Sequence, residues 1–276
     1  MKNSRVFKLL PLTVFFFAFF GCTMLEEEVL DESLTGSGQA EVVSGSIGPV
    51  YGFLRGAIWL HTTNFGLQEI ASDEAILPYR GGRDWYDGGK FIAVHQHLTT
   101  PSNSLVGDTW TNMTIGLSRA LIAEERLKLE VKEGNAAAQD AVYEMVAMKA
   151  YINMLILDNW GLVFKKNASN EKSEILRGQD AIAYLEKELL SVRDVIKSDK
   201  GAGRLNQYSV KALLARLYLN AAVYRDPYGT PNFKKEDMDN VIKYTNEIIA
   251  GPYALSPEYF DVFGDNNSNN LSLIHI

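Results

Sequence analysis

The stretch Gln207-Tyr-Ser-Val-Lys-Ala-Leu-Leu-Ala-Arg-Leu-Tyr-Leu-Asn-Ala-Ala-Val-Tyr224 decides the fold. Its apolar residues recur every three or four positions and so share one helical face: Val210, Leu213, Leu214, Leu217, Tyr218 and Ala221. A second face carries the mostly small residues Ala212, Ala215, Leu219 and Ala222. A helix that is apolar on two sides must be covered on two sides, so we expect this helix to lie inside a stack of helices.

Segments with similar periodicity lie on both sides of this stretch. The spacing predicts further helices over residues 41–59, 106–131, 136–160, 180–196 and 238–250, and a polar loop over 165–173. Most of these helices would pair with a neighbour through a short polar or glycine-containing turn. The predicted fold is therefore all-α: a degenerate, tetratricopeptide-like array of helix pairs with long irregular loops.

Composition is typical of a globular protein and argues against one class of partner. The chain has 276 residues, of which 46% are hydrophobic and 22% charged, which is ample for a core. It carries 27 Lys and Arg against 34 Asp and Glu, a net charge of -7. After residue 10 there is no basic cluster with interleaved aromatic residues, so nucleic acid is not expected as a partner.

Residues 1–21 read as an export signal. Three basic residues precede an apolar run over residues 9–20, which is shorter than the roughly 20 residues of a membrane-spanning helix. The run ends in Gly21-Cys22, and Cys22 is the only cysteine. This end resembles the lipobox of bacterial lipoproteins, which implies cleavage before Cys22 and attachment of lipid, palmitate included, to it. Ordinary signal cleavage that leaves a free thiol is the alternative.

An acidic segment follows the cysteine. Residues 22–38 contain Glu26-Glu27-Glu28 and then several serine, threonine and glycine residues, so we expect a flexible acidic tether. The acidic run resembles the surface-export signal of lipoproteins in Bacteroidetes-type bacteria. A merely solvated tether would have the same composition.

The most unusual segment runs from Pro78 to Lys90 and is rich in glycine, with neither helical nor strand periodicity. A flat aromatic ring can pack on the C–H face of a sugar, and arginine or aspartate beside it can hydrogen-bond sugar hydroxyls. The candidate ligand-binding residues are therefore Arg80, Arg83, Asp84, Trp85 and Tyr86. The alternative is that the two aromatic residues only attach a long loop to the helices.

Other candidate sites are weaker. The sequence contains no G-x-S-x-G, P-loop or H-E-x-x-H motif. The acid pairs Asp73/Glu74 and Asp84/Asp87 could in principle serve a glycosidase, and the two histidines at 95 and 97 could share a strand face and bind a metal. Residues 265–270 alternate like a calcium loop but lack its glycine and closing glutamate. We expect a protein that is not an enzyme and has no metal or cofactor.

Three further segments resemble one family. They are residues 147–163 with their Trp160-Gly161 turn, residues 203–219, and residues 248–255 followed by the aromatic run 259–263. Together with the lipobox they are similar to the SusD/RagB family of nutrient-binding outer-membrane lipoproteins. Members are commonly near twice this length, so the chain resembles a truncated member, with a helical domain over 39–270 and a non-native tail over 271–276.

The resemblance implies a function. It implies that the protein sits on the cell surface, anchored by lipid in the outer membrane, and passes oligosaccharides to a SusC-like TonB-dependent transporter. It also implies that aromatic residues after the first helices contact the glycan, and Trp85 and Tyr86 match that region by position. Two alternatives remain: a helical-repeat scaffold for protein partners that binds no sugar, and a glycoside hydrolase.

Overall fold

The computed structural model of the protein describes residues 37–82, 84–201, 203–255 and 257–263. Contacts divide the chain into Met1–Gly38 and Gln39–Ile276, and almost all described residues belong to the second unit. The predictions about the signal segment, Cys22, most of the tether and the last residues from 264 on therefore lie outside the described residues.

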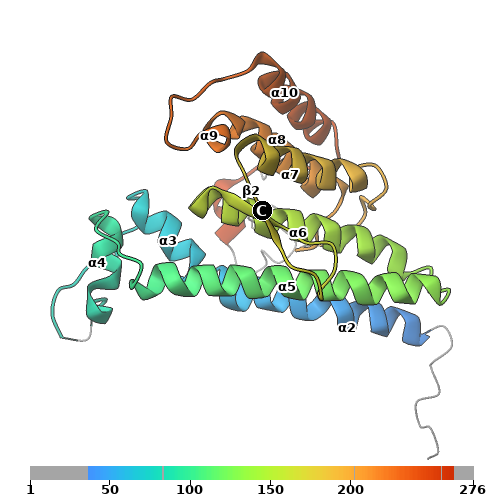
Figure 1. Ribbon diagram of the computed structural model, residues 1–276, viewed down its shortest axis with the longest axis horizontal. Coiled ribbons are helices and arrows are strands. Elements are labelled where there is room, and N and C mark those ends of the chain that lie inside the picture. The colour runs from blue at the N-terminus through green and yellow to red at the C-terminus, as the bar shows by residue number, and fades with distance from the viewer. Residues whose placement is uncertain (1–36, 83, 202, 256, 264–276) are drawn as a thin grey trace, which may run out of the picture. The chain divides into compact units, whose positions relative to one another are not determined.

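The described chain is mostly helical (Figure 1), as the sequence predicted. Its α-helices are α2 (Ser37–Phe53), α3 (Asn64–Ala71), α4 (Lys90–His95), α5 (Ser104–Lys132), α6 (Ala138–Trp160), α7 (Gly178–Val192), α8 (Gln207–Leu219), α9 (Ala221–Arg225) and α10 (Lys235–Ile249). Shorter elements are the π-helix η1 (Leu54–Ile58), the 3-10 helices η2 (Asp87–Gly89) and η3 (Tyr259–Phe263), and the strands β1 (Leu162–Lys165) and β2 (Glu174–Arg177).

Helix α6 forms the centre of the core. Every residue from 147 to 157 is buried, and the helix packs against α5 on one side and α7 on another (Figure 1). Burying each of its large apolar side chains contributes about 1.5–3 kcal/mol. Helix α6 is thus buried along more of its length than α8, the first part of the helix predicted over 207–224.

The predicted helix over 207–224 is divided in two. Asn206 caps α8 by accepting the backbone N–H of Ser209, and Asn220 separates the end of α8 from the start of α9. The side chain of Asn220 donates to the carbonyl of Arg216, a local bond that competes with continued helix. The first apolar face is buried as expected, but the second is covered only in part, since Leu219 is 54% exposed.

A small hairpin follows α6 and was not predicted. Gly161, with φ of 64°, ends the helix, and β1 then pairs antiparallel with β2 on the far side of the predicted loop. Asn153 of α6 holds the hairpin, because its side chain donates to the carbonyl of Phe164 at 3.1 Å and accepts the N–H of Phe164 at 2.9 Å. Four-residue strands are too short for a clear alternation signal.

Within the described residues, no helix is long and apolar enough to cross a membrane.

Candidate functional site

The glycine-rich segment between α3 and α4 is an ordered loop with several left-handed turns. Gly81, Gly82, Gly88 and Gly89 all have positive φ angles, between 66° and 100°. Residues with a side chain rarely adopt such angles, so glycine suits these four positions. The intervening residues 84–86 are presented at the bend.

Asp84 holds the loop together. Its carboxylate accepts the backbone N–H of Arg80 at 3.0 Å, the Nε–H of Arg80 at 2.9 Å and the backbone N–H of Trp85 at 3.0 Å. The bond from the Arg80 side chain and those from the two backbone groups lower the pKa of Asp84, so it is charged at neutral pH. Asp84 therefore positions Trp85 through the backbone.

Three aromatic rings of this loop face solvent, and we call Tyr79, Trp85 and Tyr86 the aromatic patch. Tyr79 and Tyr86 are each 50% exposed, and Trp85 is 41% exposed. The rings of Tyr79 and Tyr86 lie 4.8 Å apart, centre to centre, at 44° to one another. Aromatic rings that are exposed near one another can mark a binding surface.

Trp85 also has a support beneath it. Its ring meets His61 edge-on at 5.5 Å and the buried ring of Phe91 at 6.2 Å. These contacts fix the orientation of the indole while much of it stays exposed. Trp85 thus attaches the loop to the residues beneath it and is also partly exposed, so its ring has a fixed orientation without a ligand.

The structure brings together four of the five predicted site residues. Arg80 and Asp84 form an ion pair, Trp85 follows Asp84, and Tyr86 pairs with Tyr79, while Arg83 lies outside the described residues. Sequence reasoning omitted Tyr79 as a site residue, although it belongs to the same aromatic-rich loop. The supporting rings of His61 and Phe91 carry no local signal, because only the packing of α3 and α4 brings them to Trp85.

The weaker candidates are placed differently. His95 ends helix α4 and contacts Asp73 at 2.8 Å, so the predicted strand face shared with His97 is wrong. The candidate acid Asp87 pairs with Lys90 at 3.9 Å. In the described part of the chain, no group of three or more His, Cys, Asp or Glu side chains is arranged to hold a metal.

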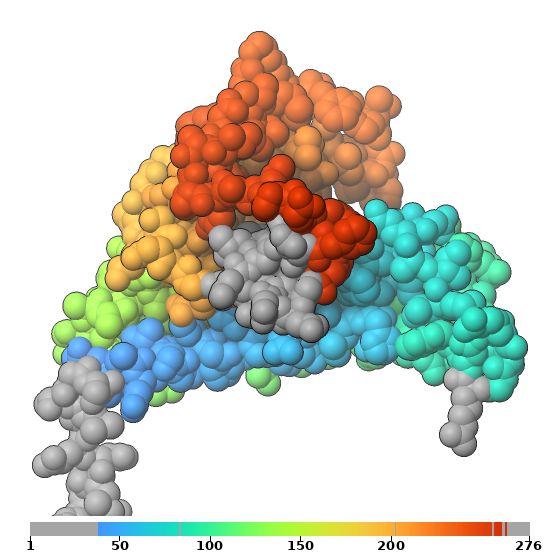
Figure 2. All heavy atoms as spheres, turned by 180° about the vertical axis from the view of Figure 1, so that it is seen from behind, coloured from blue at the N-terminus to red at the C-terminus, as the bar shows by residue number. Residues whose placement is uncertain are grey.

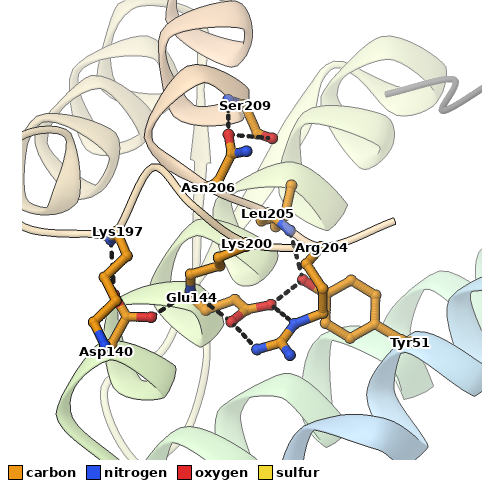
Figure 3. Close-up of polar contacts among 9 residues, drawn as sticks. All are labelled: Tyr51, Asp140, Glu144, Lys197, Lys200, Arg204, Leu205, Asn206 and Ser209. Carbon is orange, nitrogen blue, oxygen red and sulfur yellow. Dashed lines mark hydrogen bonds and ion pairs between the residues drawn. The ribbon is translucent and has the colours of Figure 1, made fainter. Parts of the chain in front are cut away.

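A second notable region is a charged network on the first turns of α6 (Figure 3). Glu144, which is fully buried, accepts the Nε–H and Nη2–H of Arg204 at 2.5 Å, the Nζ of Lys200 at 2.7 Å and the hydroxyl of Tyr51 at 2.5 Å. One turn earlier, Asp140 contacts Lys200 at 2.7 Å. The network therefore ties α2 and the segment before α8 to α6.

Electrostatics keep Glu144 charged. Burial by itself raises the pKa of a carboxyl group, but the hydrogen bonds from Arg204 and the charge of Lys200 outweigh it and hold the pKa of Glu144 below its ordinary value. Burial and the neighbouring carboxylate raise the pKa of Tyr51, so its hydroxyl remains a donor.

Comparison with known proteins gives a consistent result. No family model matches the chain. The starch-binding protein SusD of Bacteroides thetaiotaomicron is 24% identical over 215 residues, which cover 76% of this chain and 36% of that protein. A SusD-like protein of Bacteroides ovatus is 21% identical over 209 residues, covering 72% and 38% of the two chains. The chain thus spans somewhat more than a third of these relatives.

Solved structures share the fold. A crystal structure with xylogluco-oligosaccharide superposes with a TM-score of 0.65 at 18% identity, over 84% of this chain and 45% of that one. Surface glycan-binding protein A of Bacteroides thetaiotaomicron, in complex with laminarihexaose, gives 0.62 at 19% identity, over 82% and 46%. A SusD superfamily protein of Bacteroides vulgatus gives 0.62 at 14% identity, over 85% and 48%.

Proposed function

From the homology of this chain to SusD and SusD-like proteins and from its SusD-superfamily fold, we propose that it binds oligosaccharide or polysaccharide without cleaving it. The observation that carries the proposal is the aromatic patch, which offers three partly exposed rings on a loop stiffened by Asp84. Two proteins of the same fold were solved with oligosaccharides, one with a xylogluco-oligosaccharide and one with laminarihexaose.

The geometry suggests how a sugar would bind. The indole of Trp85 and the paired rings of Tyr79 and Tyr86 would pack against the C–H faces of successive sugar rings. The side chain of Arg80 is 77% exposed, and it bonds to Asp84 through Nε. Its two terminal Nη groups would therefore donate to sugar hydroxyls. Asp84 would act indirectly, because its oxygens already accept three loop hydrogen bonds.

Substitutions in the aromatic patch test this function. Trp85→Ala and Tyr86→Ala should each weaken binding of maltohexaose, laminarihexaose or a xylogluco-oligosaccharide by about tenfold or more, because each removes a ring that a sugar would cover. Isothermal calorimetry and affinity electrophoresis would measure the effect. Tyr228→Ala is a matched control, since Tyr228 is 99% exposed and lies outside the patch. Unchanged affinity in both patch variants would refute the assignment.

We further propose that the protein is a lipoprotein of the outer membrane, anchored through Cys22 and exposed on the cell surface. It would pass its glycan to a SusC-like TonB-dependent transporter. The support is the sequence Gly21-Cys22 after the apolar run, together with the homology to SusD.

Replacement of Cys22 tests the anchor. A Cys22→Ser variant has no thiol to accept lipid, so we expect it to move from the membrane fraction to the soluble fraction of cells in which the unmodified chain is membrane-bound. Immunoblots of the two fractions, with Ser33→Ala as the control, would show the shift. Continued retention of the Cys22→Ser chain in the membrane would count against lipid anchoring.

A further inference from the structure

A large cleft lies between η1 and α3 on one side and α6 with the segment 203–216 on the other. Its volume is about 960 Å³, at the upper end of the range typical of small-molecule sites. Figure 2 shows the blue residues along the bottom, the cyan residues at the right, the orange residues above and the red C-terminal residues between them. No residue of the aromatic patch lines the cleft.

Aromatic side chains form part of the cleft wall. Trp59 follows η1, Phe65 lies in the first turn of α3, and Tyr51 comes from α2. Phe65 is 45% exposed although α3 buries its neighbours Asn64 and Gly66. These rings provide apolar faces of the kind that pack on sugar C–H groups.

One of the residues that line the cleft carries a buried hydroxyl. Tyr151 of α6 is 4% exposed and lines the cleft, and its oxygen accepts the Nε1–H of Trp59 at 3.0 Å. No acceptor for its own proton is recorded among the described residues. Burial raises the pKa of Tyr151 to about 12, so the hydroxyl stays protonated and remains a hydrogen-bond donor.

Other polar groups in the cleft are also available. For the side chains of Arg55, Gln68 and Glu74, the structure records no hydrogen-bond or ion-pair partner in the part of the chain that it describes. They supply a guanidinium, an amide and a carboxylate, which together can donate to and accept from sugar hydroxyls. A cleft that combines apolar rings with both kinds of polar group fits a polyhydroxylated ring better than a purely apolar ligand.

The wall opposite α3 is held rigidly. Glu144 fixes Arg204 through two hydrogen bonds of 2.5 Å, and Asp158 fixes Arg216 at 2.6 Å. Both arginines line the cleft. Side chains already held in one conformation lose little entropy when a ligand binds.

We propose that this cleft is a second saccharide site, which takes the end or a branch of a neutral oligosaccharide. The inference rests on the proposed function for its ligand class, but it uses other residues than the aromatic patch. Phe65 and Trp59 would cover the sugar faces, and Tyr151, Gln68 and Glu74 would bond to its hydroxyls. An oligosaccharide that occupies both sites at once would dissociate from the protein more slowly than one that occupies a single site.

Separate variants of the two sites distinguish them. We would compare the unmodified protein, a Phe65→Ala/Gln68→Ala variant and Trp85→Ala by calorimetry with maltohexaose, laminarihexaose and a xylogluco-oligosaccharide. Phe65 is partly exposed, so its replacement should leave the fold intact, which circular dichroism would verify. Ile122→Ala is the matched control, because Ile122 is a 56% exposed apolar residue on α5 that does not line the cleft.

We expect the Phe65→Ala/Gln68→Ala variant to bind the oligosaccharides about tenfold or more weakly than the unmodified protein. A protein that carries these changes together with Trp85→Ala should lose the binding that Trp85→Ala alone retains. Normal affinity in the cleft variant, with loss in Trp85→Ala, would overturn the second site and leave the aromatic patch standing. The converse would support the cleft and overturn the patch. Absence of binding to all three probes by the unmodified protein would overturn both.

Discussion

Replacing Glu144 with glutamine should lower the free energy of unfolding by about 3 kcal/mol, the lower end of the range for breaking a buried ion pair. The change leaves Lys200, whose side chain is 6% exposed, with one countercharge in place of two. We take the lower end because the side chain of Arg204 is 38% exposed, so water would screen part of its charge.

Denaturant unfolding would measure this loss. A suitable control is Asp239→Asn, which removes an exposed ion pair with Lys235 one turn away and should leave the free energy of unfolding nearly unchanged. A Glu144→Gln protein within about 1 kcal/mol of the unmodified chain would contradict the view that the network in Figure 3 holds α2 and the segment before α8 to α6.

Glu144 should also make the stability of the protein depend on pH, with a loss of stability in acid. The pKa of Glu144 is lower in the folded protein than its ordinary value of 4.5, so its stabilising contribution is present above that pH and is lost as the pH falls through the folded pKa. The unmodified protein should therefore lose stability below about pH 4.5, and Glu144→Gln should lose less over the same interval. Melting temperatures measured from pH 7 to pH 3 would show whether the two curves converge.

Replacing Asn153 with leucine should lower the free energy of unfolding by about 2–4 kcal/mol. Asn153 is 1% exposed, and its amide satisfies both the N–H and the carbonyl of Phe164. Leucine keeps the volume but leaves these two backbone groups without their partners, and each unsatisfied buried group costs about 1–3 kcal/mol. Because Phe164 is half-buried, water would recover part of that cost.

The measurement is again denaturant unfolding, together with hydrogen exchange at the hairpin of β1 and β2, whose amides should exchange faster in the variant. Asn170→Leu serves as the control, because Asn170 is exposed in the loop between the strands. Equal stability and equal exchange in Asn153→Leu would show that the hairpin does not depend on α6 for its position.

The long helices could be predicted from the sequence because their apolar periodicity is a local property, whereas the short helices α3 and α4 were not predicted. The segment 106–131 became α5 within two residues at either end, and the segment 136–160 became α6. The candidate loop was also visible, since four glycines and a cluster of aromatic residues interrupt every regular period between Pro78 and Lys90. Thus the helical class, the loop and two of its three exposed rings, Trp85 and Tyr86, could be predicted from the amino-acid sequence alone.

Tertiary structure decided the rest, because those features depend on contacts between residues far apart in the chain. Asp84 accepts hydrogen bonds from residues of its own loop, and the ring of Trp85 packs against His61, which precedes α3 in the sequence. The interior position of α6 and the cleft between α3 and the start of α8 follow from how the helices pack. A helical period states which face of a helix is apolar, but only packing determines which helix covers that face and what surface is left open.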